Sequence, residues 1–220
     1  MEATRLIQPP RAASGPLMLA DIGGYTQFLQ DVATRHADDP FAGGVIPPAY
    51  EMVSSLLDGI ITRLVPPFTL SKIEGDAVFV YSMDTASVPH GQALRDTVEA
   101  CYGEFRTRLD RAHEVWTCRC GACERIHGLE LKFVVHTGPF FIHQVAGSTE
   151  LAGPDVVLAH RLLKSEAAEV VGSPAYALVT RSAAQTLDVP PDDARALTAR
   201  FDHYAPVEAL VYRVGAREAA

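Results

Sequence analysis

One segment decides the fold: Pro16-Leu17-Met18-Leu19-Ala20-Asp21-Ile22-Gly23-Gly24-Tyr25-Thr26. Its apolar run ends in a single carboxylate, Asp21, and two glycines then allow a sharp turn before the helical pattern of Tyr25 to Val32. This order predicts a strand, an acid, a turn and a helix. Asp21 would then lie beside free backbone amides at a helix start, where a cation and phosphates can both bind. The alternative is that Asp21 only caps the helix.

The composition indicates a folded protein without a nucleic-acid-binding surface. The 220 residues, 48% of them apolar and 21% charged, are enough for one sizeable core. A net charge of -8, from 27 acidic and 19 basic residues, argues against a nucleic-acid partner. No apolar run approaches the roughly 18 residues of a membrane span, and the N-terminus lacks a signal-peptide core. We therefore expect a cytoplasmic protein with no membrane partner, in which an anionic ligand needs a cation.

The rest of the chain alternates between helical and strand patterns. Residues 1–15 carry paired prolines and no periodicity, so we predict a flexible arm before a single domain over residues 16–215. Apolar stripes from Met52 to Leu64 and from Leu94 to Ala112 predict two long helices. A shorter helix is expected after Pro154. Strands are predicted at 68–73, 77–83, 129–136, 140–145, 175–180 and 207–214, with turns at 74–76 and 137–139 and a loop at 147–153.

This order of elements favours an α+β sandwich, a mainly antiparallel sheet with helices on one face. The first predicted hairpin brings a second carboxylate, Asp76, to a strand end. We expect Asp21 and Asp76 to lie on neighbouring strands, close enough to share a metal site. We also expect the two long helices to leave the other face of the sheet for a partner subunit, because its strands are too apolar for water.

Four motifs in order resemble the catalytic domain of class III adenylate and guanylate cyclases. They are Asp21-Ile22-Gly23-Gly24-Tyr25-Thr26, Lys72-Ile73-Glu74-Gly75-Asp76, His136-Thr137-Gly138, and Gly153 with the later Arg161. The resemblance covers Leu17 to about Leu163 and is to a divergent, bacterial-type member. It implies a ferredoxin-like βαββαβ cyclase-homology fold. It also implies a head-to-tail homodimer that converts a nucleoside triphosphate into a 3′,5′-cyclic nucleotide and diphosphate.

The resemblance also assigns metal and phosphate ligands. Asp21 and Asp76 match the two aspartates that hold a pair of Mg²⁺ or Mn²⁺ ions. Paired metals lower the pKa of the attacking ribose hydroxyl and stabilise the leaving-group charge. The triphosphate and substrate would be held by the segment that follows the first aspartate, which is Ile22, Gly23, Gly24 and Tyr25.

The resemblance also implies residues that recognise the base and stabilise the transition state. Lys72 and Glu150 match the base-recognising pair, and a lysine donor with a carboxylate acceptor favours ATP. Arg161 matches the arginine that stabilises the pentavalent transition state. Val157, however, stands where the family has an asparagine, and no late phosphate-binding lysine is evident. A slow cyclase is therefore expected, and the alternative is a catalytically degenerate nucleotide or metabolite sensor with the same fold.

Three of the four cysteines lie close together, in Cys118-Arg119-Cys120-Gly121-Ala122-Cys123, and His127 follows them. Cys118, Cys120, Cys123 and His127 can complete a tetrahedral zinc site, and His113 or Cys101 can replace His127. Four protein ligands leave no open position, so such a site is structural. The alternative is free thiols in a helix-to-strand connection.

The segment 117–127 is an insertion relative to the usual cyclase pattern, and a zinc-stabilised interaction module is a third possible function. The remaining histidines show no spacing that points to a shared site, and we expect most of them at the surface or in the core: His36, His90, His136, His143, His160 and His203.

Overall fold

The computed structural model describes residues 9–36, 48–115, 118 and 120–215. In these residues eight strands form one sheet of order β2-β3-β1-β4-β6-β8-β7, and β5 pairs with β4 outside that order. The strands are β1 (Arg11–Gly23), β2 (Thr69–Glu74), β3 (Ala77–Tyr81), β4 (Glu130–Val145), β5 (Ser148–Ala152), β6 (Tyr176–Thr180), β7 (Arg195–Ala199) and β8 (Val207–Arg213). All neighbours are antiparallel except β4 and β6, which are parallel.

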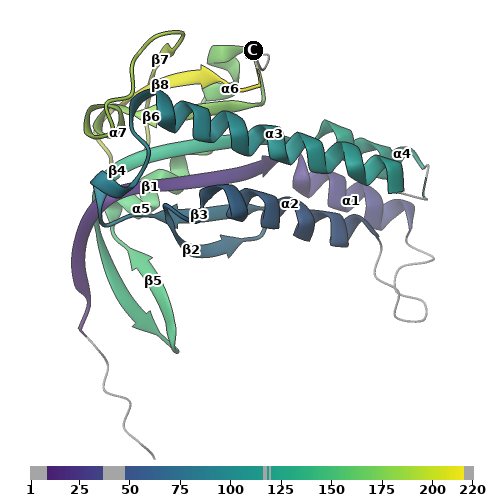
Figure 1. The fold of residues 1–220 in the computed structure, drawn as a ribbon, viewed down its shortest axis with the longest axis horizontal. Coiled ribbons are helices and arrows are strands. Elements are labelled where there is room, and N and C mark those ends of the chain that lie inside the picture. Colours follow the sequence, from purple (N-terminus) through teal and green to yellow (C-terminus); the bar gives the residue numbers. More distant parts are fainter. Residues whose placement is uncertain (1–8, 37–47, 116–117, 119, 216–220) are drawn as a thin grey trace, which may run out of the picture.

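The helices gather mainly on one side of this sheet (Figure 1). They are α1 (Tyr25–Arg35), α2 (Pro48–Leu64), α3 (Gly91–Val115), α4 (Gly121–Glu124), α5 (Pro154–Leu162), α6 (Ala167–Val171) and α7 (Arg181–Thr186), with short 3₁₀ turns η2 (Thr85–Ser87) and η3 (Arg125–Gly128). Among the described residues, no helix combines the length and apolar character that crossing a membrane requires. The predicted α+β class, with a mainly antiparallel sheet and the two long helices on one face, is confirmed.

Strand β1 lies in the middle of the sheet, between β3 and β4. Its residues from Gly15 to Ala20 are all buried, which is typical of a strand covered on both faces. The strand begins at Arg11, inside the segment that we predicted as a flexible arm. Residues 11–15 have little apolar periodicity, but they pair with the outer half of β4, where Arg11 lies opposite Ile142. Residues 1–8 of the predicted arm lie outside the described residues.

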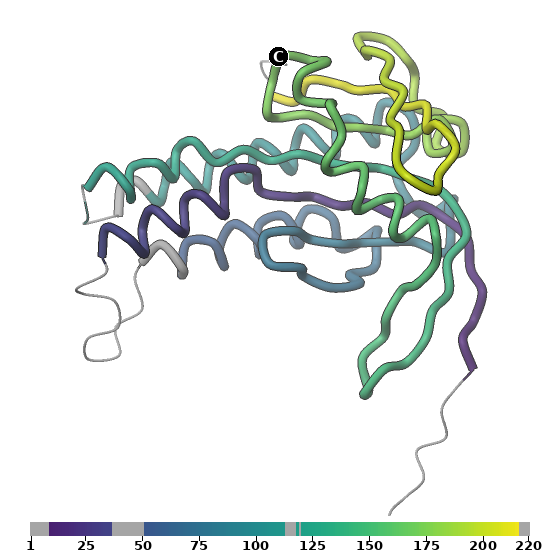
Figure 2. The backbone as a smooth tube through the Cα atoms, turned by 180° about the vertical axis from the view of Figure 1, so that it is seen from behind, coloured from purple at the N-terminus to yellow at the C-terminus, as the bar shows by residue number. Residues whose placement is uncertain are grey.

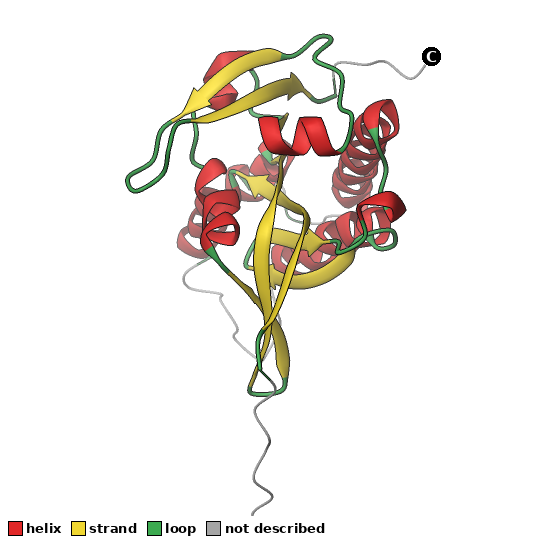
Figure 3. Ribbon diagram, turned by 90° about the vertical axis from the view of Figure 1, so that its left-hand side faces the viewer, coloured by secondary structure: helices red, strands yellow, loops and turns green. Residues whose placement is uncertain are grey.

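The predicted turn at Thr137-Gly138-Pro139 is wrong, because β4 runs straight through it. These residues keep their register with β1, where Gly15 lies opposite Gly138. The hairpin turn comes later, at Ala146 and Gly147, which both have positive φ values. Strand β5 therefore replaces most of the loop predicted at 147–153, and the β4–β5 hairpin extends away from the body of the molecule (Figures 2 and 3).

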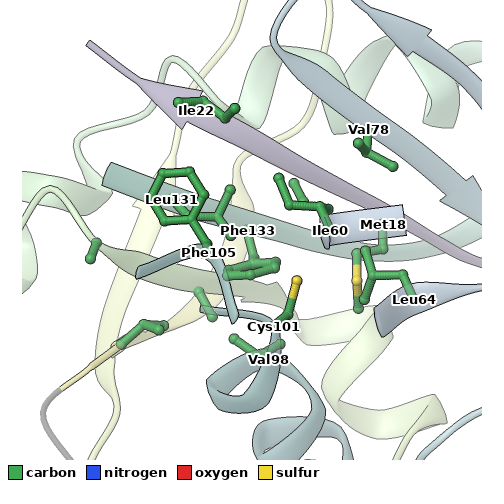
Figure 4. Packing of buried hydrophobic residues seen from close by; sticks show 14 of the residues in the cluster. Met18, Ile22, Ile60, Leu64, Val78, Val98, Cys101, Phe105, Leu131 and Phe133 are labelled. Atoms are coloured by element: carbon green, nitrogen blue, oxygen red, sulfur yellow. The ribbon is translucent and has the colours of Figure 1, made fainter. Parts of the chain in front are cut away.

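Alternate residues of β1 belong to two cores on opposite faces of the sheet. Met18 and Ile22 pack with Ile60 and Leu64 of α2 and with Phe105 of α3 (Figure 4). Other members of the larger core come from the same two helices, from α1, and from inward-facing residues of β3, β4 and β6.

The opposite face of the sheet holds a second, smaller core. Leu17 and Leu19 of β1 pack there with Ala159 and Leu162 of α5. The chain thus itself covers part of the face that we expected to be left for a partner subunit. Val157 of α5 stays 47% exposed.

Candidate functional site

The two acidic residues predicted to share a site are placed on neighbouring strands. Asp21 lies near the end of β1, opposite Ala77 of β3 and Lys132 of β4. Asp76 directly precedes β3 in the β2–β3 turn, and its carbonyl oxygen accepts a hydrogen bond of 3.1 Å from the Ile22 amide. The predicted placement of Asp21 and Asp76 at the ends of neighbouring strands is confirmed. That the two carboxylates share one metal site stays a prediction.

Electrostatics at this edge favour a bound cation. Burial, and after it the negative charge of Asp21, raises the pKa of Asp76 above its usual value. Lys132 Nζ lies 2.9 Å from Asp21 Oδ2, so one ammonium faces two carboxylates and one negative charge is left over. Carboxylate oxygens are ligands that Mg²⁺ and Mn²⁺ prefer. The donor set therefore fits a divalent metal ion, which would relieve the repulsion between the two acids.

Helix α1 starts directly beyond this pair. Its N-cap is Gly24, in the left-handed conformation with φ 85°. A residue with a Cβ is strained there, which explains the second glycine of the segment. Because Gly24 and not Asp21 occupies the N-cap position, the alternative that Asp21 is only a helix cap is wrong. The first amides of α1, without a capping side chain, can contact an anion.

A second charged group surrounds Lys72 of β2. Its Nζ lies 2.9 Å from Glu74 Oε1 and 3.2 Å from Glu150 Oε2 of β5. The hydrogen bond to Glu74 is the main cause of the raised pKa of Lys72. His160 Nε2 of α5 lies 2.6 Å from the other oxygen of Glu74. The structure thus brings Lys72 and Glu150 together, and it adds Glu74 and His160, which we had not predicted. Glu74 was detectable, because it stands two positions from Lys72 on the same strand face.

Both charged groups lie on the sheet face opposite α2 and α3. Asp21 alternates with Leu19, which is opposite Phe79, and Phe79 is opposite Lys72. Leu19 and Phe79 belong to the smaller core, so Asp21 and Lys72 face the same side. Strand β3 separates the strands that carry them, which places their backbones about 10 Å apart across the sheet. Within one chain these are two groups, each with its own partners.

Arg161 of α5 is held by the segment before β8. Its Nη1 donates a hydrogen bond of 3.0 Å to the carbonyl oxygen of Asp202, and its guanidinium carbon lies 5.4 Å from the centre of the Tyr204 ring. These contacts occupy the side chain that the resemblance links to the transition state. Its recruitment by a ligand therefore requires that they break or that the ligand binds beside them.

His136, in the third motif, has a structural role. The side chain is buried, with Nε2 2.8 Å from Asp155 Oδ1 and Nδ1 3.0 Å from Thr180 Oγ1. A Cβ on Gly138 would lie only 2.4 Å from that Asp155 oxygen. The motif therefore lets the start of α5 pack closely on β4.

The three clustered cysteines are joined by a histidine from a distant part of the chain. His36 Nε2 lies 3.8, 3.3 and 3.4 Å from the Sγ atoms of Cys118, Cys120 and Cys123, respectively. All four ligand atoms lie within 4.8 Å of one another. Burial acts to raise the pKa of Cys120, but hydrogen bonds from Cys123, His36 and Cys118 lower it to about 6.

The residues that we predicted as the fourth zinc ligand lie elsewhere. His127 is outside the cluster, and its carbonyl oxygen accepts a hydrogen bond from Arg106. Cys101 is buried in the larger core, where burial raises its pKa to about 12. The side chain of His113 lies outside the described residues. His36, which we had assigned no role, is therefore the fourth member.

Comparison with known proteins places the chain in a family. The profile of a family described as "Protein of unknown function (DUF2652)" matches residues 53–170, more than half of the chain. The chain belongs to this family. A protein of Mycobacterium tuberculosis (strain ATCC 25618 / H37Rv), described as "Uncharacterized protein Rv2561/Rv2562", is 34% identical over 139 residues. That match covers 62% of this chain and 60% of the relative's length.

Solved structures of nucleotide cyclases share the fold. The adenylyl cyclase CyaB from P. aeruginosa matches with a TM-score of 0.58 and 16% identity over 97% of this chain and 100% of that chain. A bacterial light-regulated adenylyl cyclase matches with a TM-score of 0.63 and 15% identity, covering 92% of this chain and 53% of that one. A class III adenylyl cyclase-like ATP-binding protein from Pseudomonas aeruginosa gives 0.55 and 14%, covering 84% and 37%. At these identities the likeness shows the cyclase fold alone.

Proposed function

We propose that this member of the family binds a nucleoside triphosphate with Mg²⁺ or Mn²⁺ and converts it slowly into a 3′,5′-cyclic nucleotide and diphosphate. One observation carries the proposal. Asp21 and Asp76, far apart in sequence, lie at the ends of two adjacent strands, directly before the N-terminus of α1. Two carboxylates for cations, beside a helix N-terminus that no side chain caps, form a site for a metal-bound polyphosphate.

The residues around this edge have distinct roles in the proposal. Asp21 and Asp76 hold the cations, and Lys132 keeps the Asp21 carboxylate in position through its 2.9 Å contact. Gly23 and Gly24 offer backbone amides to the phosphates, with Tyr25 at the helix start. The Ile22 amide, which the resemblance also assigns to the phosphates, already donates its hydrogen bond to the carbonyl oxygen of Asp76. When bound, the cations lower the pKa of the ribose hydroxyl and stabilise the charge of the departing diphosphate.

The base is recognised by the second charged group. Lys72 donates a hydrogen bond and Glu150 accepts one, a combination that suits the adenine edge and favours ATP. The backbones of Asp21 and Lys72 lie about 10 Å apart within one chain. A head-to-tail homodimer would place the acid pair of one copy opposite the base-recognising group of the other. Because the site faces away from α2 and α3, a second copy can approach it.

The test is incubation of the pure protein with each nucleoside triphosphate and Mn²⁺, followed by mass spectrometry for the cyclic product. Asp21→Ala should abolish product formation. The matched control is Asp110→Ala, which removes an exposed carboxylate from α3, on the other side of the sheet. Product formation that survives Asp21→Ala unchanged would contradict the proposed site.

A second candidate function is nucleotide sensing without turnover, and two observations favour it. Val157 offers no hydrogen bond where the resemblance calls for an asparagine, and Arg161 is already bound to Asp202 and Tyr204. One of the structures that share the fold is described as an ATP-binding protein. Equilibrium binding with Mn²⁺ separates the two functions, because a sensor binds nucleotide without making the cyclic product.

A further inference from the structure

Two distant parts of the chain converge at one end of the molecule. Helix α1 ends at Arg35, and His36 occupies its C-cap. The connection between α3 and β4 holds Cys118, Cys120, α4 and η3, and α4 lies against α1 (Figures 1 and 2). His36 and Cys118 are 82 positions apart in the sequence, so only the fold brings them together.

We propose that His36, Cys118, Cys120 and Cys123 bind one structural Zn²⁺ ion, which fastens the end of α1 to the connection between α3 and β4. The site lies at the opposite end of α1 from Asp21 and is independent of nucleotide turnover.

The spacing of the four side chains carries this proposal. Zn–S bonds of about 2.3 Å and Zn–N bonds of about 2.0 Å at a tetrahedral angle put sulfur and nitrogen roughly 3.5 Å apart. The three S–N separations here are 3.3, 3.4 and 3.8 Å. The four atoms also lie within 4.8 Å of one another. These separations fit four ligands around one zinc ion.

The chemistry of the ligands selects the metal. Thiolates with one imidazole prefer Zn²⁺ over Mg²⁺ or Ca²⁺, which take oxygen ligands. All three cysteines are free thiols in the structure. Four protein ligands close the coordination sphere, which leaves no position for a substrate. The ion would therefore act in folding and stability.

Other contacts hold the ligands in place. Arg125 of η3 forms an ion pair with Asp31 of α1, which ties the same two segments together. Phe28 and Val32 of α1 share the larger core with Cys123, so the thiol is fixed by packing.

The short helix in this connection needs such support. Helix α4 has four residues, too few to be stable by backbone hydrogen bonds alone. A metal crosslink supplies the stability that so short an element lacks.

The first experiment measures zinc by mass spectrometry in protein purified under reducing conditions and desalted. Wild type should retain one zinc ion per chain. His36→Ala should bind zinc about 100-fold more weakly, because one of four ligands is missing. The matched control is His127→Ala, which removes the histidine that the sequence pattern favours. Loss of zinc from the His127 variant with retention in the His36 variant would overturn the proposed ligand set.

The second experiment needs no variant and guards against a His36→Ala protein that fails to fold. Metal is removed from wild type with a chelator under reducing conditions, and Co²⁺ is then added. An absorption spectrum of tetrahedral Co²⁺ with thiolate charge transfer should appear, and three thiols should become protected from a thiol reagent. Wild type that contains no zinc and gives no such spectrum would refute the site.

Discussion

Asp21 of β1 and Asp76 of the β2–β3 turn lie just before the start of α1, whereas one imidazole nitrogen and three cysteine sulfurs gather at its end. Hard oxygen ligands with few protein donors suit a cation that comes and goes with a substrate. Soft ligands that fill all four positions suit an ion that stays. The same helix would therefore join an exchangeable site for chemistry to a permanent site for stability.

Removal of the metal at the end of α1 should have the largest effect. Chelation of wild type, or Cys123→Ala, should lower the free energy of unfolding by at least about 3 kcal/mol, because zinc binding is coupled to folding. Thermal unfolding with and without chelator measures this. In Cys123→Ala the chelator should have no further effect. An equal chelator effect in both proteins would show that the metal at this end is not bound by Cys123.

Asp21→Ala should affect only the proposed cation site at the start of α1. It removes a proposed cation ligand and leaves Lys132 without its carboxylate partner. The Mn²⁺-dependent affinity for nucleotide should fall about 100-fold, or roughly 2.7 kcal/mol. Zinc content should remain at one ion per chain, measured on the same sample. If Asp21→Ala releases zinc, then the two ends of α1 are coupled and the comparison above is wrong.

Val157→Asn tests whether the proposed cyclase activity is limited by one missing contact. An added hydrogen bond made mainly in the transition state should raise kcat by about 10-fold or more and change binding little. Val145→Asn is the control, since Val145 is equally exposed but lies on the β4–β5 hairpin. Undetectable product from wild type and from Val157→Asn, with nucleotide still bound, would favour the sensor.

The smallest effect is expected from Asp76→Asn, which should stabilise the protein by up to about 1 kcal/mol. The pKa of Asp76 is raised above 3.8 in the folded state, so the folded protein holds this proton more tightly than the unfolded chain does. Stability is therefore lost as the pH rises from 3.8 through the raised pKa. The neutral amide avoids this loss, and its advantage should shrink as the pH is lowered.

Added Mn²⁺ supplies the converse measurement for Asp76. It should stabilise wild type and leave Asp76→Asn nearly unchanged, because the amide is a poorer ligand for the cation. Thermal unfolding of both proteins over a pH series, with and without Mn²⁺, gives all the required values. A variant less stable than wild type at neutral pH without metal would contradict the electrostatic argument.

The sequence by itself determined the elements that depend on neighbouring residues. The apolar run before Asp21 and the two glycines after it predict a buried strand and a helix start, because strand burial and turn geometry are local properties. The Glu74-Gly75-Asp76 turn is equally local, and it fixes Asp76 directly before β3. The helical stripes in α2 and α3 likewise predict which face they bury.

Only the tertiary structure decided contacts between distant segments. Gly138 and Pro139 indicate a turn locally, but pairing with β1 keeps β4 extended through them. His36 has no neighbour in the sequence that marks it as a ligand, and it meets the cysteines only because α1 packs against α4. Arg161 is engaged by Asp202 and Tyr204, which its own helix does not predict. Each of these outcomes depends on long-range packing, which local propensity does not encode.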